Sequence, residues 1–232
     1  MKILFLSNAN SIHTIRWVTS LAKKNIEICL FSFEKIIGDE YSNIQNISII
    51  NCNFNTTSTK DGEISKILLL KFLPKLIKTI KIFKPDLIHA HYATSYGLLG
   101  ALCGFKPYIL SVWGRDVFDF PKLSFIHELL IKFNLYRANE VLSTSHIMAA
   151  ETNRYSKKKI IVTPFGVDLK KFKKKKVNSM FNNNDIVIGT VKTLSSKYGI
   201  NFLIEAFSIL KKNTDLPLKL LIVGDGEDKY KL

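Results

Sequence analysis

Residues 188–199 read IGTVKTLSSKYG, a short apolar run that passes through a polar loop into a helix-like pattern. The run ends at Val191, and the loop that follows contains Lys192 and Lys197. A strand that leads through a loop into a helix is the repeating unit of α/β folds. Because the start of a helix offers free backbone N–H groups to an anion, we predict a phosphate site that uses both lysines. The alternative is that both are solvated surface residues.

The same alternation of strand-like and helix-like segments runs along the whole chain. The apolar runs are short and continuous, which is typical of strands buried on both faces of a parallel sheet. The expected strands are 2–7, 26–33, 47–51, 86–90, 108–112, 140–144 and 159–163, followed by strand 186–191, helix 199–212 and strand 218–223. We therefore predict an α/β fold with a doubly wound parallel sheet, plus the first β-α-β unit of a second domain of the same kind.

Several segments between the strands have apolar residues at helical spacing. Ser11 stands where it would cap the first of these helices, and Pro121 can occupy the first turn of a helix that runs to about Tyr136. Residues 64–84 are the most basic amphipathic segment, in which Pro74 would kink a helix or begin a second one. Its lysine face is either the solvated side of a helix that covers the sheet or a surface for an anionic membrane.

A stretch rich in lysine and asparagine interrupts the periodicity between residues 166 and 185. We predict residues 1–165 as the first domain, 166–185 as an exposed linker, and 186–232 as part of a second domain. The linker lysines are either solvated or in contact with phosphates or a membrane.

The chain is strongly basic, with 34 Lys and Arg against 19 Asp and Glu and a formal net charge of +15. This charge would attract nucleic acid, an anionic membrane surface or anionic substrates. A general richness in Lys, Asn and Ile explains the charge equally well. The hydrophobic fraction of 47% is ample for a packed core and argues against disorder.

The cysteines and the lengths of the apolar runs help to predict the cellular compartment of the protein. No apolar run approaches the roughly 20 residues of a membrane-spanning helix, and the apolar start is shorter than the ~7–15-residue core of a signal peptide. We expect a cytoplasmic protein, with peripheral contact at the inner face of the membrane as a further option. Cys29, Cys52 and Cys103 are far apart and form no Cys-x-x-Cys pair, so we predict free thiols in a reducing compartment and no metal site.

Polar and aromatic residues collect directly after the expected strands. Ligands of open α/β sheets bind beyond the carboxyl ends of the strands, so these residues define a candidate cleft. The main candidates are Asn10, His13, His91, Trp113 and Asp116, with Gly166 and Asp168 after the seventh strand. Structural alternatives remain open: a helix cap for Asn10, a core histidine for His89, and packing roles for His13, His91 and Trp113.

Several common motifs are missing from the sequence. No Gly-x-Gly-x-x-Gly follows the first strand, and there is no Walker A loop or Gly-x-Ser-x-Gly elbow. Gly224-Asp225-Gly226 follows the last expected strand but lacks the third glycine of a dinucleotide fingerprint. No cluster of His or carboxylate residues has the spacing of a metal site.

Five segments, taken in order, resemble the retaining nucleotide-sugar glycosyltransferases of the group-1 type (family four). These enzymes have the GT-B fold of two facing Rossmann-like domains. The segments are 8–17 (NANSIHTIRW), 85–91 (PDLIHAH), 111–117 (SVWGRDV), 163–168 (TPFGVD) and 191–199 (VKTLSSKYG). The resemblance extends over nearly the whole chain.

The resemblance implies roles for most of the candidate residues. Lys192 and Lys197 would hold the donor diphosphate, with Lys192 in place of the usual Arg. Asn10, His13, His91, Trp113 and Asp116 would form the acceptor or sugar cleft, Gly166 and Asp168 the interdomain cleft, and Gly224 and Gly226 a loop of the donor domain. No catalytic residue is assigned, because Trp113 replaces a His, Phe165 replaces an Asn and Arg115 replaces a small residue.

The resemblance also implies a reaction and its partners. The chain would transfer a sugar with retention from a UDP- or GDP-linked donor to a glycan or lipid-linked acceptor, without a metal or other cofactor and without nucleic acid. In the family the donor domain continues with a Glu-x7-Glu segment that binds the donor sugar, and Leu232 comes before it, so we expect a truncated donor domain. A non-catalytic binding module and a GT-B sugar-nucleotide epimerase are the alternatives.

Overall fold

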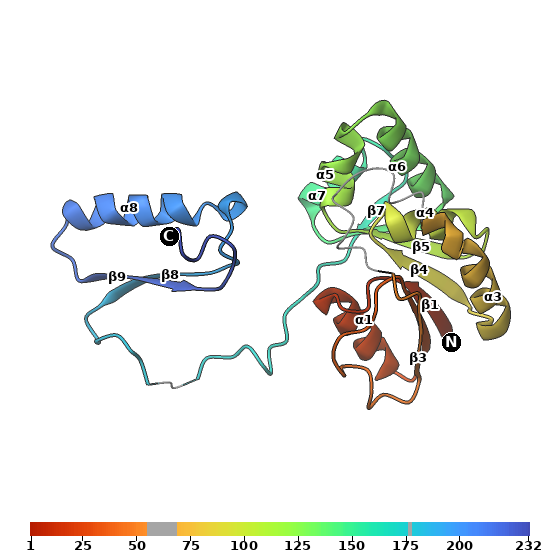
Figure 1. Ribbon diagram of the computed structural model, residues 1–232, viewed down its shortest axis with the longest axis horizontal. Helices are drawn as coiled ribbons and strands as arrows, with labels where there is room; N and C mark the ends of the chain where they lie inside the picture. The colour runs from red at the N-terminus through yellow and green to blue at the C-terminus, as the bar shows by residue number, and fades with distance from the viewer. Residues whose placement is uncertain (55–68, 176–177) are drawn as a thin grey trace. The chain divides into compact units, whose positions relative to one another are not determined.

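The computed structural model describes residues 1–54, 69–175 and 178–232. The chain divides into two compact units, Met1–Val167 and Asp168–Leu232, which are described separately below (Figure 1). Between the last strand of the first unit and the first strand of the second, the described residues form turns but no helix or strand.

The first unit is built on one parallel sheet of seven strands. These are β1 (Lys2–Leu6), β2 (Glu27–Ser32), β3 (Ile47–Asn51), β4 (Leu87–His91), β5 (Tyr108–Val112), β6 (Glu140–Ser143) and β7 (Ile160–Val162). Their order in the sheet is β3-β2-β1-β4-β5-β6-β7, and every neighbouring pair is parallel. The chain therefore winds outward in both directions from the β1–β4 pair, as predicted. Each strand agrees with its predicted range to within one residue at either end.

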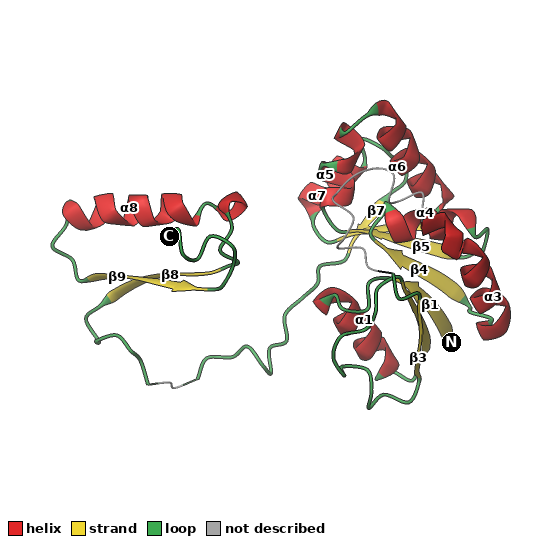
Figure 2. Cartoon of the chain, in the orientation of Figure 1, coloured by secondary structure: helices red, strands yellow, loops and turns green. Residues whose placement is uncertain are grey.

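Helices cover both faces of this sheet (Figure 2). They are α1 (Ile12–Ala22), α3 (Leu73–Phe83), α4 (Ser95–Leu102), α5 (Arg115–Phe118), α6 (Phe125–Arg137) and α7 (His146–Thr152). On one face α1 packs through Val18 and Ala22 against Phe5 and Leu30. On the other face, buried residues of α3, α4 and α6 share a core with Leu4 and the alternate residues of the neighbouring strands. Side chains of a strand point alternately to the two faces, so a continuous apolar strand serves both cores.

Two details of the helix predictions are wrong. Pro121 lies in a separate 3₁₀ turn, Phe120–Lys122, and α6 begins only at Phe125. Ser124 is extended between the two, with φ −168° and ψ 169°, which breaks the single helix that was expected. Ser11 does stand at the N-cap of α1, but its side chain makes no capping hydrogen bond.

The basic segment 64–84 is described from Leu69 onward, and residues 64–68 lie outside the described part. A 3₁₀ turn, Leu69–Phe72, precedes α3, and Pro74 lies in the first turn of α3. Pro74 therefore begins a second helix and does not kink a single one. Leu76 is fully buried in the core, whereas Lys75, Lys78 and Lys81 are exposed, so α3 covers the sheet and presents its lysines outward.

The second unit contains a parallel strand pair and one long helix. The elements are β8 (Ile186–Val191), a 3₁₀ turn at Ser196–Tyr198, α8 (Ile200–Lys212) and β9 (Leu218–Val223). The strands pair in register from Ile186 with Leu218 to Val191 with Val223. This is the β-α-β unit that the sequence predicted, with its helix beginning one residue later than expected.

Across the residues that the structure describes, no helix is both long enough and apolar enough to cross a membrane. Cys29, Cys52 and Cys103 are free thiols. Burial raises the pKa of all three, as expected for thiols in apolar surroundings.

Candidate functional site

Four rings meet beyond the carboxyl ends of the central strands of the first unit. His13 lies at the start of α1, His91 ends β4, Trp113 follows β5 and Phe165 follows β7. The ring centroids of His91 and Trp113 are 4.7 Å apart, and those of His13 and Trp113 are 5.6 Å apart. The His13 and Phe165 rings stack at 3.7 Å with an interplanar angle of 10°. We call these four residues the ring cluster.

His91 is fully buried within the ring cluster and is tied to α1 through two hydroxyl groups. Its Nδ1 lies 3.0 Å from Ser7 Oγ, which in turn lies 2.6 Å from Thr14 Oγ1. Its Nε2 has no hydrogen-bond partner among the described residues. Burial, with smaller contributions from His89 and His13, holds the pKa of His91 well below its ordinary value. The imidazole is therefore neutral near pH 7 and has one unused ring nitrogen.

His89 lies two residues earlier on β4 and has the structural role that the sequence allowed. It is buried, and its Nε2 lies 2.8 Å from Ser111 Oγ on the neighbouring strand. The rings of Phe5 and Trp17 pack on it with centroids at 5.1 and 5.5 Å. Burial lowers the pKa of His89 to about 3. The interpretation of His89 as a core histidine is confirmed.

Asp116 lies in the first turn of α5, three residues after Trp113, and has no exposed surface. Its carboxylate accepts hydrogen bonds from the backbone N–H groups of Ala93 (2.7 Å), Gly114 (2.7 Å) and Trp113 (3.1 Å). Burial raises the pKa of Asp116, while these N–H groups act in the opposite direction. The residue thus joins the loops after β4 and β5, and Asn134 of α6 holds the same Ala93 by donating to its carbonyl at 2.8 Å. This geometry gives Asp116 a positioning role within the predicted cleft.

Asn10 is occupied by the backbone of the loop that follows β2. Its Oδ1 accepts from the N–H of Ile37 at 2.8 Å, and its Nδ2 donates to the carbonyl of Lys35 at 2.8 Å. Asn10 therefore fastens two rim loops together. It does not cap α1, because Ser11 holds the N-cap position.

Phe165 and Arg16 belong to the site but were not among the predicted residues. Phe165 stacks on His13, and one turn further along α1 the Nη1 of Arg16 donates to the carbonyl of Gly166 at 2.9 Å. Two contacts from one helix thus hold the segment after β7. Phe165 follows a strand as the predicted candidates do, and that position is the signal that could have identified it.

The second unit brings the two predicted lysines together around one aromatic ring. Lys192 Nζ lies 4.4 Å and Lys197 Nζ 4.8 Å from the centroid of Tyr198. Lys192 and Tyr198 also line a pocket of about 380 Å³ at the carboxyl ends of β8 and β9. An ammonium group over an aromatic face is stabilised by the ring quadrupole, so the ring can hold both cations close in spite of their repulsion. Tyr198 was not predicted.

Gly224 and Gly226 allow the loop after β9 to approach the lysine loop closely. A Cβ atom on Gly224 would overlap the carbonyl oxygen of Lys192, and one on Gly226 would overlap that of Leu194. The two loops are joined by hydrogen bonds from Lys192 N to the Val223 carbonyl and from Leu194 N to the Asp225 carbonyl, both at 3.0 Å. Any side chain at either glycine would force them apart.

The remaining candidates belong to different units. Gly166 lies in the first unit and Asp168 in the second, so their joint placement in an interdomain cleft stays a prediction. Asp168 is exposed and accepts from the backbone N–H groups of Lys170 and Lys171, which lowers its pKa. In the described ranges, no three His, Cys, Asp or Glu side chains are grouped as a metal site would require.

Comparison with known families identifies the chain. Residues 2–145 match the glycosyl transferase 4-like family, and residues 171–232 match the glycosyl transferases of group 1. The chain belongs to the glycosyl transferase 4-like family.

One curated relative and several solved structures extend this result. TuaC of Bacillus subtilis (strain 168), whose name describes a teichuronic acid biosynthesis glycosyltransferase, is 31% identical over 171 residues, which are 68% of this chain and 42% of TuaC. Sucrose-phosphate synthase from Thermosynechococcus elongatus has a TM-score of 0.68 at 16% identity over 97% of this chain and 62% of its own. HepE of Anabaena, in complex with UDP and glucose, has a TM-score of 0.62 at 16% identity over 100% of this chain and 63% of its own.

The fold is shared with enzymes of another class. The UDP-GlcNAc 2-epimerase of Neisseria meningitidis has a TM-score of 0.56 at 16% identity over 97% of this chain and 66% of its own. At this identity the structural likenesses show the fold alone, which is that of the Rossmann-like GT-B proteins. The chain spans less than half of TuaC and less than two thirds of each of these structures.

Replacing Asp116 by asparagine tests the positioning role. Asp116→Asn turns one acceptor oxygen into an N–H donor, which leaves a buried backbone N–H unpaired. We expect the free energy of unfolding to fall by about 2–3 kcal/mol, measured by urea unfolding followed through tryptophan fluorescence. The matched control is Asp119→Asn, whose exposed carboxylate only pairs with Arg115, and which should change stability by about 0.5 kcal/mol or less. Equal effects of the two variants would contradict the assignment.

The buried histidines predict a stability that depends on pH. The folded-state pKa of His89 is far below that of the unfolded chain, so the unfolded state binds the additional proton once pH falls below about 6.5. The free energy of unfolding should therefore decrease by about 1.4 kcal/mol for each pH unit that the pH falls below that value, for each such histidine. His89→Gln cannot titrate there, so between pH 7.5 and 5.5 its free energy of unfolding should change less steeply than that of the wild type. Parallel curves for the two proteins would show that His89 does not titrate in this way.

Proposed function

We propose that this chain is part of a glycosyltransferase that moves a sugar from a nucleoside diphosphate sugar to a hydroxyl group of a glycan or lipid-linked acceptor, with retention of configuration. Membership in the glycosyl transferase 4-like family supports the reaction class. The name of TuaC supports a role in the synthesis of a cell-surface polysaccharide. Retention is inferred from the resemblance of the sequence motifs to retaining enzymes.

The observation that carries this proposal is the pair of lysines around Tyr198. Lys192 and Lys197 lie at the carboxyl end of β8, directly before α8, which is where an α/β unit binds phosphate. The neighbouring pocket of about 380 Å³ is lined by Lys192, Tyr198, Gly224 and Asp225, and the Asp225 carboxylate pairs with Lys229 at 3.3 Å. The solved HepE structure contains UDP and glucose, and we transfer the nucleotide class, UDP or GDP, to this chain as part of the proposal.

The chemistry of the proposed reaction explains why cations are needed there. As the bond between the anomeric carbon and the phosphate oxygen breaks, the departing nucleoside diphosphate gains negative charge. The acceptor oxygen forms the new bond to the anomeric carbon and gives up its proton to the departing phosphate oxygen. Two fixed ammonium groups and the N–H groups at the start of α8 would stabilise that charge more in the transition state than in the ground state. These groups supply the stabilisation from the protein itself, so we propose transfer without a metal. Lys192 offers a compact charge instead of the two-pronged contact of an arginine.

Two other functions share some of these observations. A sugar-nucleotide epimerase has the same fold, but both families that match the chain are glycosyl transferases. A non-catalytic binding module would keep the acceptor-side fold without turnover. Incubation with UDP-sugars and with GDP-sugars, followed by mass spectrometry, separates the three. A transferase releases the nucleoside diphosphate, an epimerase returns an isomerised nucleotide sugar and a binding module changes nothing.

Nucleotide binding by lysine variants tests the proposal directly. We expect the 232-residue chain to bind UDP or GDP in isothermal titration calorimetry, and Lys192→Ala or Lys197→Ala to weaken that binding by about tenfold or more through loss of a charge-assisted contact. Lys211→Ala at the far end of α8 removes the same charge from the same unit and should leave the affinity unchanged. Binding that is absent with both nucleotides, or equally weakened by all three variants, would refute the proposed donor site.

A further inference from the structure

Helix α6 exposes an unusually apolar face. Phe125, Ile126 and Tyr136 are 70%, 74% and 76% exposed, and Leu129 and Phe133 lie between them on the same side. Lys132 and Glu128 are partly exposed on this helix, and they pair with each other. A helix at the surface of a soluble domain ordinarily presents polar residues outward. Figure 1 shows α6 at the outer side of the first unit.

Helix α3 provides the contrast within the same unit. Both helices bury residues in the same core, but the outward face of α3 contains Lys75, Lys78 and Lys81. The apolar character of the outward face of α6 is therefore not shared by every helix on the surface of this unit. A contiguous exposed apolar patch of this kind is typical of an interaction site.

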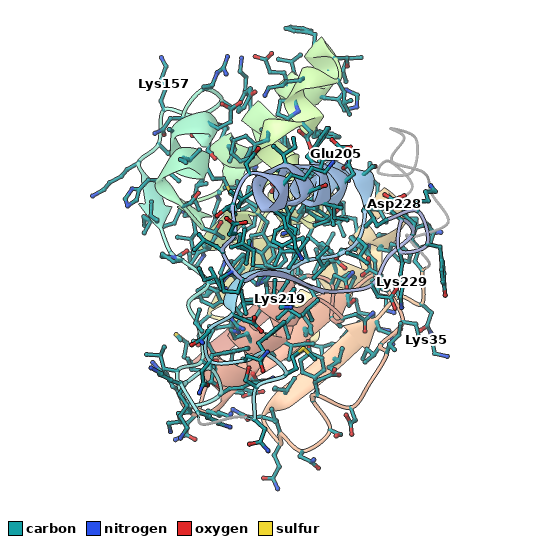
Figure 3. All side chains as sticks on the ribbon, turned by 90° about the vertical axis from the view of Figure 1, so that its left-hand side faces the viewer. Lys35, Lys157, Glu205, Lys219, Asp228 and Lys229 are labelled. Carbon is teal, nitrogen blue, oxygen red and sulfur yellow. The ribbon has the colours of Figure 1, made fainter. Side chains whose placement is uncertain are left out.

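The C-terminal end of α6 is surrounded by positive charge. Two adjoining pockets of about 400 and 730 Å³ meet there, and Tyr136 and Lys158 line both. Six cationic side chains line the two pockets: Lys106, Lys132, Arg137, Arg154, Lys157 and Lys158. No carboxylate is among the described residues that line either one. Lys157 projects away from the body of the unit (Figure 3).

Part of this charge also serves the fold. Lys158 Nζ donates to the carbonyls of Tyr136 (2.7 Å) and Leu135 (3.2 Å) at the C-terminal end of α6, and Arg137 Nε donates to Ala101 at the end of α4 (3.1 Å). Two of the six cations are also paired with carboxylates, Arg154 with Glu151 at 3.3 Å and Lys132 with Glu128, and Glu140 acts on Lys158. Lys106, Arg137 and Lys157 supply the rest of the positive charge. Burial and the neighbouring cations lower the pKa of Lys106 and Lys158, with Arg137 acting on the first and Lys106 on the second.

These pockets lie at the opposite edge of the sheet from the ring cluster. Lys106, Arg137 and Lys158 precede β5, β6 and β7, whereas the ring cluster lies beyond the carboxyl ends of β4, β5 and β7. The charged surface is therefore separate from the candidate site, and the glycosyl transfer proposed above makes no use of it.

We propose that the outward face of α6 and the cations at its C-terminal end form a docking surface for an anionic lipid bilayer. The apolar side chains would enter the acyl boundary, Tyr136 would lie at the level of the headgroups, and the flanking lysines and arginines would contact lipid phosphates. A nucleic acid would use the cations but not the apolar face, and a second copy of this chain would bring like charges together. The position differs from the basic segment 64–84 that the sequence suggested.

Vesicle co-sedimentation of the 232-residue chain tests this surface. The probes are vesicles of phosphatidylcholine alone and vesicles that also contain phosphatidylglycerol. We expect binding to the anionic vesicles that weakens with salt, and a reduction of about tenfold in both Phe125→Ser/Ile126→Ser and Lys132→Gln/Lys157→Gln. The matched control, Lys78→Gln/Lys81→Gln on α3, removes the same charge and should bind as the wild type does. Circular dichroism verifies that each variant is folded.

Several outcomes would overturn the proposal. These are equal binding to both vesicle types, no binding to either, and loss of binding in the α3 control while the α6 variants still bind. Self-association in sedimentation velocity that Phe125→Ser/Ile126→Ser abolishes would identify a second copy as the occupant instead. Nucleotide affinity should be the same in all these variants, so a failure here is distinguishable from a failure of the proposed donor site.

Discussion

The buried carboxylate of Asp116 is the interaction on which the candidate site of the first unit depends. Strands β4 and β5 are neighbours in the sheet, but their pairing says nothing about where the loops beyond them go. By accepting from Ala93, Trp113 and Gly114, one anion fixes both loops at once. Full burial makes this effective, because water does not compete for the carboxylate and each N–H that lost its partner would remain unsatisfied. The positions of Trp113 and His91 in the ring cluster follow from that constraint.

In the second unit, close backbone contacts instead of a buried charge fix the loops beyond the strands. Gly224 and Gly226 let the loop after β9 lie directly against the loop that contains Lys192, and Tyr198 holds both lysines over one ring. The two units thus repeat one architectural rule, a site beyond the carboxyl ends of parallel strands, with different chemistry. The first presents neutral rings, and the second presents cations. The proposed transfer would use this contrast, since it needs to bind both a neutral sugar and a charged diphosphate.

Local pattern predicted most of the fold because strands buried on both faces are continuous apolar runs that end abruptly. It also located Lys192, Lys197, His13, His91 and Trp113, since each stands next to the end of an expected strand or in the first turn of an expected helix or just before it. The direction of individual side chains could not be predicted from spacing. Spacing does not show that Asp116 turns inward to the backbone or that Phe165 stacks on His13. The break at Ser124 and the apolar outward face of α6 were missed for the same reason. Both features depend on what packs around the helix, which the spacing of apolar residues in the sequence does not show.

Hydrogen–deuterium exchange of the 232-residue chain, with and without saturating UDP or GDP, tests the central claim most directly. If the nucleotide diphosphate binds where the lysines meet the start of α8, exchange should slow at the backbone amides of residues 192–203 and around Gly224–Gly226 with at least one nucleotide. Unchanged exchange in both segments, or protection confined to the first unit, would contradict the assignment of this loop as the donor site.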